Sequence, residues 1–496
     1  MSHISPETLK TQAEQVLEQL LAKGGSLTAK DRMAIPAQAM PEQEPAVRAR
    51  NFTEVALGYS EAQARVEAMR CLQCRKKPCV EGCPVRLDIP GFVAAIAAGE
   101  YQQAIDIIKR DSLLPAICGR VCPQESQCQA ECTLTKALKD VNQAVSIGRL
   151  ERFAADWERT QGMKTPAVKP STGRRVAVIG SGPASLVVAA DVRREGHAVT
   201  ILEAFHKPGG VMIYGIPEFR LPKQIVQVEI DSLLAMGVEL RTNFVVGRTR
   251  RLQDLLQVDG YDAIFVGTGA GLPKFMSIPG EEYVGVFSAN EYLTRVNLMK
   301  AYMKESGTPV LPARHVVVVG GGNVAMDAAR TALRLGAERV SIVYRRTEAE
   351  MPARVEEVGH AKEEGIEFRL LQNPTRILGD EHGRVTGIEC LKYELGEPDD
   401  SGRRRPVAIP GSEFLLEADT VIVAIGNGSN PLLTSTAPDL KLNKWGNILI
   451  DPDGKTSMDR VFAGGDIVLG AATVILAMGQ GRQAAVSINR MLAALP

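Results

Sequence analysis

CLQCRKKPCVEGCP (residues 71–84) and CGRVCPQESQCQAEC (residues 118–132) contain eight of the nine cysteines of the chain. Each run includes a Cys-Pro pair, which is typical of iron–sulfur proteins, where the last cysteine of a run often binds the other of two [4Fe–4S] clusters. Structural zinc favours paired Cys-x2-Cys units, and only one such pair is present. Disulfides need an exported chain, and the N-terminus does not resemble a signal peptide. The two runs therefore predict two iron–sulfur clusters.

The composition argues against several classes of function. The chain has 496 residues, of which 45% are hydrophobic and 23% charged, as in globular proteins of about three domains. Lys and Arg together number 58, as do Asp and Glu, and zero net charge gives no support for nucleic-acid binding. No apolar run approaches the ~20 residues of a membrane span. We therefore expect no nucleic-acid or membrane partner, and clusters in an unexported chain indicate a reducing cytoplasm.

The N-terminal third is predicted to be a small helical domain around the clusters. Residues 1–50 indicate a helix and a proline-rich connector, expected to be either an arm packed on a partner or another domain, or a mobile tail. Residues 89–111, between the cysteine runs, have helical periodicity with Pro90 at a helix start. Residues 133–160 indicate a further helix.

A nucleotide-binding βαβ unit is predicted after the polar linker at 161–174. The strand ending at Gly180 leads into GSGPAS (180–185), a helix, and a second strand that ends at Glu203. Gly180 and Gly182 let the backbone approach a pyrophosphate at the helix N-terminus, and the Glu203 carboxylate can bond a ribose hydroxyl. A dinucleotide is therefore expected here.

The pattern recurs at GGGNVA (320–325), between a strand and a helix. The strand after this helix ends in Tyr344, followed by Arg345 and Arg346, where the first unit has its acid. Arginines form charge-assisted hydrogen bonds to a 2′-phosphate, which a carboxylate would repel. The first site should therefore take a cofactor without a 2′-phosphate, such as FAD, and the second should take NADPH.

The flavin-binding part is predicted to be discontinuous. Residues 261–270 and 420–428 are strands that end in glycine-rich turns, where the chain would cross between domains. Residues 460–466 form a strand that brings Asp466 into a glycine turn before a helix, where acid and helix N-terminus could hold a flavin. The NADPH-binding domain is thus expected to be inserted within the flavin-binding domain.

Together these motifs resemble a known family over about residues 30–496. The chain resembles the small (beta) subunit of NADPH-dependent glutamate synthase and, equally, the large subunit of NADH-dependent ferredoxin:NADP oxidoreductase. It is also similar to the N-terminal electron-entry half of dihydropyrimidine dehydrogenase. The resemblance implies an α/β fold with an N-terminal helical two-cluster iron–sulfur domain and two Rossmann-like domains. The expected division is 1–165 for the iron–sulfur domain and arm, 172–290 and 425–496 for the FAD-binding domain, and 291–424 for the NADPH-binding domain.

The resemblance also implies ligand sets for the clusters. One cluster would take Cys71, Cys74, Cys79 and Cys132. The other would take Cys83, Cys122 and Cys128, with Glu151 as an oxygen ligand. Cys118 is then a spare thiol, although the cysteine spacing alone would make it the fourth ligand.

The cofactor-binding residues are implied in the same way. The FAD positions are Gly180, Gly182, Pro183, Ala184, Glu203, Gly210, Arg220, Gly465, Asp466 and Thr473. The NADPH positions are Gly322, Asn323, Val324, Arg345, Arg346 and Arg354, with Ala424 and Gly426 nearby. Ser185 departs from the glycine of many relatives, and its small side chain should not prevent FAD binding.

The expected function is electron transfer. No nucleophile–base pair is evident, so the hard chemistry belongs to the cofactors. NADPH would reduce FAD, and electrons would pass through two [4Fe–4S] clusters to a second redox subunit in a hetero-oligomer. The favoured partner is the glutamate-forming large subunit of glutamate synthase. The alternative is an electron-bifurcating ferredoxin:NADP oxidoreductase complex, with a small flavoprotein subunit and ferredoxin. A redox-sensing scaffold without enzymatic activity is a third possibility, which Arg345, Arg346 and Asp466 argue against.

Overall fold

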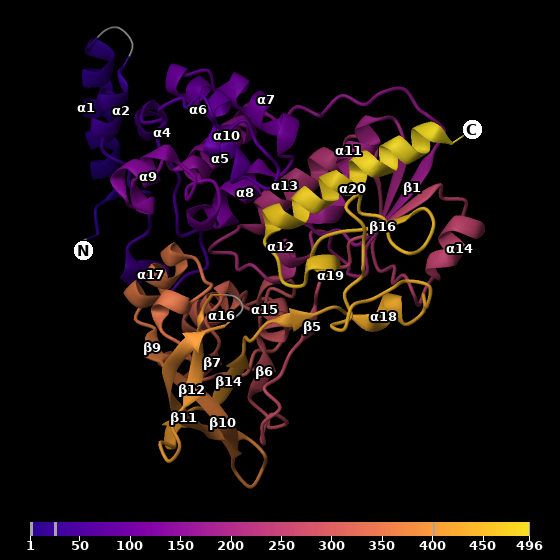
Figure 1. The fold of residues 1–496 in the computed structure, drawn as a ribbon. Helices are drawn as coiled ribbons and strands as arrows, with labels where there is room; N and C mark the ends of the chain where they lie inside the picture. The colour runs from indigo at the N-terminus through magenta and orange to yellow at the C-terminus, as the bar shows by residue number, and fades with distance from the viewer. Residues whose placement is uncertain (1–2, 24–26, 400–401, 496) are drawn as a thin grey trace.

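The computed structural model describes residues 3–23, 27–399 and 402–495 and combines a helical N-terminal third with two parallel sheets (Figure 1). The α-helices of the N-terminal third are α1 (Pro6–Ala22), α2 (Ala29–Ala34), α3 (Pro45–Arg48), α4 (Glu61–Met69), α5 (Pro78–Glu81), α6 (Ile89–Ala98), α7 (Tyr101–Asp111), α8 (Pro115–Val121), α9 (Thr133–Leu138) and α10 (Ile147–Gln161). Two 3₁₀ turns, η1 (Gln124–Ser126) and η2 (Val141–Gln143), lie among them. The predicted fold class is confirmed.

Residues 89–111 form two helices where the periodicity suggested continuous helix. Gly99 ends α6 with φ +84°, a conformation that favours glycine, and α7 begins two residues later. Ile96 and Ile105, on either side of this break, are fully buried. The turn therefore folds two apolar faces onto one core.

The first parallel sheet is the predicted flavin-binding sheet. Its order is β16-β4-β1-β2-β3, which brings the C-terminal strand β16 beside β4. Its strands are β1 (Arg175–Ile179), β2 (Ala198–Leu202), β3 (Glu239–Arg241), β4 (Ala263–Val266) and β16 (Val461–Ala463). Its helices are α11 (Pro183–Arg194), α12 (Val211–Tyr214), α13 (Lys223–Leu234), α14 (Leu252–Gln257), α18 (Pro431–Thr434), α19 (Asp466–Leu469) and α20 (Val474–Ala494).

The second parallel sheet is the predicted NADPH-binding sheet, in the order β6-β14-β7-β8-β9. Its strands are β6 (Val286–Ser288), β7 (His315–Val319), β8 (Arg339–Tyr344), β9 (Glu367–Leu370) and β14 (Thr420–Val423), and its helices are α15 (Ala289–Asn297), α16 (Asn323–Arg334), α17 (Val355–Glu363) and the 3₁₀ turn η3 (Glu348–Glu350). An antiparallel sheet extends below it in Figure 1, formed by β10 (Gln372–Gly379), β11 (Val385–Pro398), β12 (Arg404–Ala408) and β13 (Phe414–Glu417).

Two short strands join the parallel sheets. β5 (Leu272–Pro273) pairs antiparallel with β15 (Asn427–Gly428) where the chain leaves the first sheet and where it returns. The segment between them contains every strand of the second parallel sheet, and β16 follows it. The second sheet is therefore an insertion in the chain that forms the first.

The helical third shares its core with the first sheet. One hydrophobic cluster runs from Phe92 and Ile117 to Val178 and Ala485. The long helix α20 crosses this region in Figure 1 and packs against α11. Glu203 and the cysteine runs therefore belong to one continuous packed body.

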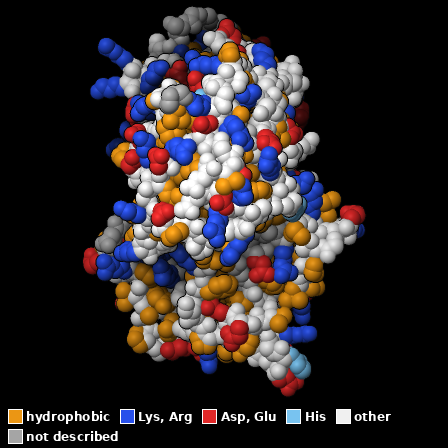
Figure 2. Space-filling model, turned by 90° about the vertical axis from the view of Figure 1, so that its right-hand side faces the viewer, with side chains coloured by type: hydrophobic (Ala, Val, Ile, Leu, Met, Phe, Trp, Pro, Cys, Tyr) orange, Lys and Arg blue, Asp and Glu red, His pale blue; other side chains and the backbone are white. Residues whose placement is uncertain are grey.

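The surface is mixed in charge, as the equal totals of acidic and basic residues predict. Figure 2 shows blue and red side chains interspersed over the face it presents. Among the described residues, none of the helices combines the length and the apolar character needed to cross a membrane.

Candidate functional site

Four of the predicted cluster ligands share one neighbourhood near the surface. Burial raises the pKa of Cys79 to about 12, and the charges of Cys71, Cys132 and Cys74 act in the same direction, so the four thiols lie close together. The Cys74 thiol is 3.1 Å from the Thr133 hydroxyl, directly after Cys132. Four soft thiol donors around one point are the set that a [4Fe–4S] cluster requires.

The second ligand set surrounds a small cavity. Cys83, Cys122, Cys128 and Glu151 all line it, and Ile475 of α20 closes one side. Glu151 is on α10 and is only 6% exposed. Within residues 3–23, 27–399 and 402–495, no three His, Cys, Asp or Glu side chains are arranged to hold a single metal ion. Donors spaced around a cavity suit a multi-atom cluster better than one zinc ion.

Cys118 lies beside this cavity but is absent from its lining. Its sulfur contacts Met478 Sδ at 3.4 Å, and the Ser112 hydroxyl donates to it at 3.9 Å. A hydrogen bond with Cys122, together with burial, raises the pKa of Cys118 well above its usual value. The placement favours Glu151 over Cys118 as the fourth donor, which remains a prediction.

Three of the predicted donors, Cys71, Cys83 and Glu151, favour their protonated forms when no metal is bound. Burial raises the pKa of Cys71 and Cys83 to about 11 in each case, and that of Glu151 to about 8. Ligands must lose their protons to bind metal, so cluster binding would release protons. These buried neutral groups would then become anionic ligands in the protein interior.

The first glycine turn is shaped for a pyrophosphate. Gly180 has φ +88°, and a Cβ there would meet the Gly267 carbonyl oxygen at 2.6 Å. A Cβ at Gly182, the residue before α11, would meet nothing within 4 Å, so the helix N-terminus is open. Pro183 begins α11, and Ala184 follows it. These residues fit the FAD that the sequence predicts.

Glu203 ends β2 beside this turn, as predicted. The Ser181 hydroxyl donates to Glu203 Oε2 at 2.5 Å and accepts the Gly209 N–H at 2.9 Å. A Cβ at Gly210 would lie 2.9 Å from the Gly182 Cα, so the two glycine loops touch. Ser181 was not singled out from the sequence, and its place between two glycines next to an acidic strand end is the signal that could have identified it.

The last predicted flavin positions come from the C-terminal segment. A Cβ at Gly465 would lie 3.1 Å from Ala184 Cβ, so this turn packs on the first glycine turn. Burial raises the pKa of Asp466 to about 6. Thr473 caps α20 and accepts the Leu476 N–H at 3.3 Å. Gln480, also absent from the sequence expectations, accepts the Gly465 N–H at 2.8 Å.

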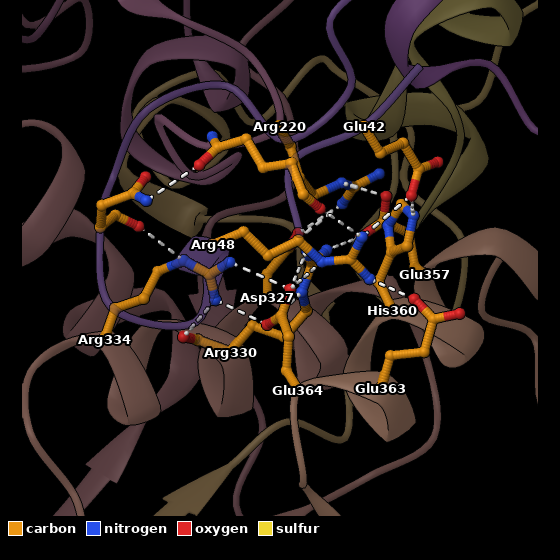
Figure 3. Close-up of polar contacts among 12 residues, drawn as sticks. Glu42, Arg48, Arg220, Asp327, Arg330, Arg334, Glu357, His360, Glu363 and Glu364 are labelled. Carbon is orange, nitrogen blue, oxygen red and sulfur yellow. Dashed lines mark hydrogen bonds and ion pairs between the residues drawn. The ribbon is translucent and has the colours of Figure 1, made fainter. Parts of the chain in front are cut away.

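Arg220 makes different contacts from the other flavin positions. Its guanidinium donates to both carboxylate oxygens of Asp327 at 2.8 Å and pairs with Glu357 at 3.1 Å (Figure 3). Both acids belong to the inserted sheet's helices α16 and α17. The expected contact between Arg220 and FAD is untested, and this pairing gives it no support.

The second glycine turn is built like the first. Gly320 has φ +148°, and a Cβ there would meet the Ala424 carbonyl oxygen at 2.4 Å, which brings the turns after β7 and β14 together. Gly322 precedes α16 and is open, because a Cβ there would meet only Pro352 Cγ, at 3.8 Å. Asn323 Oδ1 accepts the Arg354 N–H at 2.9 Å.

The rest of the expected NADPH residues lie around this turn or beyond it. Val324 is 42% exposed, and the Gly426 carbonyl accepts the Lys274 N–H at 3.1 Å. Tyr344, which ends β8, covers Gly321 with its ring and donates to the Glu350 carbonyl at 2.9 Å. The sequence shows only that Tyr344 stands where the first unit has an acid. The contact between its ring and Gly321 is evident only in the structure.

The three predicted arginines differ in their surroundings. Arg345 is exposed. Arg346 is buried and donates to Asp399 at 2.7 Å and to the Arg404 carbonyl at 2.8 Å, both in the antiparallel sheet region. Arg354 donates to the Arg120 carbonyl at 3.0 Å and to Glu356 at 2.9 Å. Only Arg345 is placed with its charge open to solvent near the end of β8.

Two sequence families match the chain. The family described as dihydropyrimidine dehydrogenase domain II, 4Fe-4S cluster, matches residues 48–163. The family described as pyridine nucleotide-disulphide oxidoreductase matches residues 174–481. The first match contains both cysteine runs, and the second contains both glycine turns.

Individual proteins match over most of the chain. The glutamate synthase (NADPH) small chain of Azospirillum brasilense is 38% identical over 467 residues, which are 91% of this chain and 94% of that protein. The NADP(+)-dependent formate dehydrogenase subunit beta of Moorella thermoacetica is 41% identical over 442 residues, which are 84% of this chain and 60% of that protein. The chain thus spans about three fifths of the length of this longer relative.

A solved structure also resembles the chain in fold. FprA of Mycobacterium tuberculosis in complex with NADPH superposes with a TM-score of 0.54 at 20% identity. The match covers 66% of this chain and 85% of that chain. At this identity the likeness concerns the fold.

Proposed function

Since the chain belongs to the glutamate synthase NADPH small chain family and to the pyridine nucleotide-disulphide oxidoreductases, we propose that it oxidises NADPH at FAD and delivers electrons through two [4Fe–4S] clusters to a partner subunit. It is an FAD- and iron–sulfur-dependent NADPH oxidoreductase. The residues named below would hold FAD, which when bound would supply the hydride acceptor for NADPH, and the cysteine runs would hold the clusters that supply single-electron transfer.

The observation that carries the proposal is the position of α20. Thr473, a proposed flavin residue, caps this helix, and Ile475 in its first turn lines the cavity of Cys83, Cys122, Cys128 and Glu151. A Cβ at Gly479 would meet the Pro84 carbonyl oxygen at 2.9 Å, so the helix lies directly against the first cysteine run. One helix therefore connects the proposed flavin site to one cluster site.

We propose roles for the residues as follows. The turns at Gly180–Gly182 and Gly210 cradle the FAD pyrophosphate, with Pro183 and Ala184 at the helix start and Glu203 at the ribose. Gly465, Asp466 and Thr473 lie at the ribityl chain and ring edge. Gly322, Asn323 and Val324 hold the NADPH pyrophosphate, with Ala424 and Gly426 alongside. Arg345 contacts the 2′-phosphate through a charge-assisted hydrogen bond. Arg346 and Arg354 are less free to do so, because Arg346 already bonds Asp399 and Arg354 already bonds the Arg120 carbonyl.

The proposed partner is the glutamate-forming large subunit of glutamate synthase, which makes glutamate from glutamine and 2-oxoglutarate. The identity over 94% of the length of a glutamate synthase small chain supports this choice. The alternative is a ferredoxin:NADP oxidoreductase complex. Relatives named as a formate dehydrogenase subunit and as an NADPH-Fe(3+) oxidoreductase subunit support partners of a different kind.

We also propose the division of the chain at 1–165, 172–290, 291–424 and 425–496, and activity in the cytoplasm. The pairing of β5 with β15 supports an insertion between the two flavin-binding segments. Strand β6, which begins at Val286, already pairs with β14 of the inserted sheet. Limited proteolysis tests the first boundary: cleavage between β5 and β6, at 274–285, would move it from 290 toward the N-terminus. Clusters in a reducing compartment support the cytoplasmic site.

Anaerobic purification tests the function. The protein should carry one FAD and about eight irons per chain, and NADPH should bleach the flavin and reduce an added dye. Zinc, or half the iron, would contradict the cluster assignment. Co-purification from the native source with a subunit that forms glutamate supports the favoured partner, and co-purification with a small flavoprotein supports the alternative.

A further inference from the structure

Residues 41–57 form a strap that crosses from the helical third to the inserted domain. Its two limbs pair through Gln43 N–H to the Val55 carbonyl at 3.0 Å and Leu57 N–H to the Pro41 carbonyl at 2.7 Å. The Val55 N–H donates to the Phe219 carbonyl of the flavin half at 2.9 Å. The strap is thereby fixed on one side to the body that holds the flavin turns.

The tip of the strap is anchored to the inserted domain by Arg48. This side chain is 1% exposed and pairs with Glu364 at 3.2 Å and with Glu363, both at the end of α17 (Figure 3). It also pairs with Glu42 of the strap itself at 2.9 Å, and Glu42 bonds His360 at 3.0 Å. Three carboxylates and the Gln43 carbonyl accept from this buried guanidinium, so each of its three nitrogens is engaged.

The anchor continues into α16, the helix that begins at the second glycine turn. Arg330 and Arg334 of α16 each pair with Glu364 at 2.7 Å. Both guanidinium groups lie over the Phe219 ring, at 4.8 and 3.9 Å from its centroid. Burial alone would raise the pKa of Glu364, but hydrogen bonds from Arg334 and Arg330 lower it to about 2. Glu364 therefore stays charged and joins strap, α17 and α16.

A second bridge enters α16 from the flavin half. Arg220 pairs with Asp327, one turn after Asn323, and with Glu357 of α17. Aromatic and backbone contacts add to the junction. The Phe52 ring of the strap stacks on the Tyr302 ring with 4.4 Å between centroids, and Arg334 donates to the Asn51 carbonyl at 2.9 Å. Charges from three parts of the chain thus converge on the helix whose N-terminus is proposed to hold the NADPH pyrophosphate.

We infer that Arg48 and Arg220 are positioning residues that hold α16 and α17 in one orientation against the flavin half, so that bound NADPH meets the flavin at the right distance and angle. The inference rests on the proposed hydride transfer from NADPH to FAD. It assigns the strap a role in this step although no residue of the strap is a predicted cofactor ligand. A displacement of about 1 Å between reacting groups can slow a reaction on the order of 10²-fold.

Arg48→Gln is the informative change because each acid that it releases keeps another hydrogen-bond partner or access to solvent. Glu364 keeps Arg330 and Arg334, Glu42 keeps its bond with His360, and the side chain of Glu363 is 55% exposed. Arg48→Lys keeps the charge but not the planar donor set, so it should recover part of the function. Phe52→Ala weakens the same junction without changing charge. Arg314→Gln is the control, since it breaks an ion pair with Glu338 that is exposed on the same domain.

Stopped-flow reduction of the bound flavin by NADPH tests the inference. Iron content, FAD content and the dissociation constant for NADPH, obtained by flavin titration, are measured on the same samples. For Arg48→Gln the flavin reduction rate should fall by between about tenfold and about 10²-fold, where the upper figure is the cost of a displacement of about 1 Å. The dissociation constant should stay within about twofold, because the nucleotide contacts lie on one domain. Arg48→Lys and Phe52→Ala should be intermediate, and the Arg314→Gln rate should equal wild type.

Electron release from the dithionite-reduced variants to ferricyanide should match wild type, since this step does not involve α16. Equal flavin reduction rates in wild type and in folded, fully loaded Arg48→Gln and Phe52→Ala would overturn the inference. A dissociation constant that rises in proportion to the lost rate would also overturn it and assign Arg48 to NADPH binding. Wild-type protein whose flavin NADPH does not reduce would instead refute the proposed function.

Discussion

Glu151 lies in the second ligand set, where burial favours its neutral form and three thiols are its neighbours. A hydrogen bond with the Ser112 side chain lowers the pKa of Glu151 only in part against burial, and a buried carboxylate without a cation is costly, so its presence at this cavity favours a cation that uses it. A hard oxygen donor on one iron should alter the potential of that cluster, because ligand identity is a main determinant of cluster potentials.

Substitutions at Glu151 and Cys118 separate the two possible fourth ligands. Cys118→Ser should leave iron content and cluster spectra nearly unchanged, because Cys118 is absent from the cavity lining and a serine hydroxyl can keep the hydrogen bond with Cys122. Glu151→Ala should perturb or lose one cluster, and Glu151→Cys should keep it at a changed potential. Iron analysis and redox titration by EPR measure these effects. Loss of iron in Cys118→Ser, with full iron in Glu151→Ala, would make Cys118 the ligand.

Arg345 should discriminate between the two nicotinamide cofactors. Arg345→Ala removes one charge-assisted hydrogen bond to the 2′-phosphate, worth roughly 1.5–3 kcal/mol, which is about 10- to 150-fold in affinity for NADPH. NADH binding should not change. Dissociation constants for both cofactors measure the effect, and an equal loss for both would remove Arg345 from the phosphate site. Arg346→Ala is the companion variant, expected to loosen the contact with Asp399 and Arg404.

Sequence patterns predicted the glycine turns and the strand that leads to Glu203, because a turn and a strand end are local features, and the cofactor roles of these residues stay predictions. Gly180, Gly182 and Glu203 depend on residues within one βαβ unit. The arginines were harder, since their partners are distant in sequence: Arg346 bonds Asp399, and Arg354 bonds the carbonyl of Arg120. No spacing rule shows that a guanidinium near a nucleotide turn is already engaged elsewhere.

Among the elements, α20 and α11 pack against each other at the proposed flavin site. A Cβ at Gly481 would lie 2.5 Å from the Ala184 carbonyl oxygen, so the absence of a side chain lets α20 approach the start of α11. The turn that precedes α11 is the proposed pyrophosphate cradle. Packing between these two helices therefore sets the shape of that cradle.

Gly481→Ala should destabilise the protein by about 1–3 kcal/mol, the usual cost of overpacking, and should lower the FAD content. Thermal unfolding and FAD per chain measure the two effects. Gly359→Ala is the matched control, because this glycine lies inside α17 with nothing within 4 Å of an added Cβ. That change should be neutral or stabilising by about 0.5–1 kcal/mol. Equal behaviour of the two variants would show that close approach of α20 is not required.

Element predictions succeeded where periodicity and turn chemistry agreed. The strands before both glycine turns and the strand that leads to Asp466 are confirmed as β1, β7 and β16. The antiparallel sheet β10–β13 was missed, because its strands are partly exposed and carry charged residues such as Arg376 and Glu389. Within β11, residues 391–395 (Leu-Lys-Tyr-Glu-Leu) alternate apolar and charged side chains, which is a period-two signal of a strand.

At the scale of the whole molecule, the iron–sulfur domain and the flavin half behave as one body because they share a core. Glu229 of α13 lies at their boundary, 4% exposed, and accepts the Ala116 N–H of α8 at 3.2 Å. Burial raises the pKa of Glu229 from 4.5 to about 7. The junction between the two domains therefore contains a carboxyl group that is protonated near neutral pH.

This group should make the junction less stable as pH rises. Between pH 4.5 and about 7 the folded protein binds the Glu229 proton and the unfolded chain does not, so the free energy of unfolding falls across this window. The full effect is about 3 kcal/mol. Glu229→Gln cannot lose this proton, so its melting temperature should exceed that of wild type at pH 8 by more than at pH 5.5. The exposed Glu305→Gln should show no such difference. A parallel pH dependence of wild type and Glu229→Gln would exclude this role.

The side-by-side pairing of β5 and β15 has a consequence for the history of such enzymes. Because the chain enters and leaves the inserted part at adjacent residues, a gene segment for that part can be acquired or replaced as a cassette without rerouting the flavin-binding chain. Nucleotide preference would then change by exchange of modules as well as by point substitution. A cassette from another lineage would still have to match the charges of Arg48 and Arg220, so compatibility at that junction limits which exchanges yield an active hybrid.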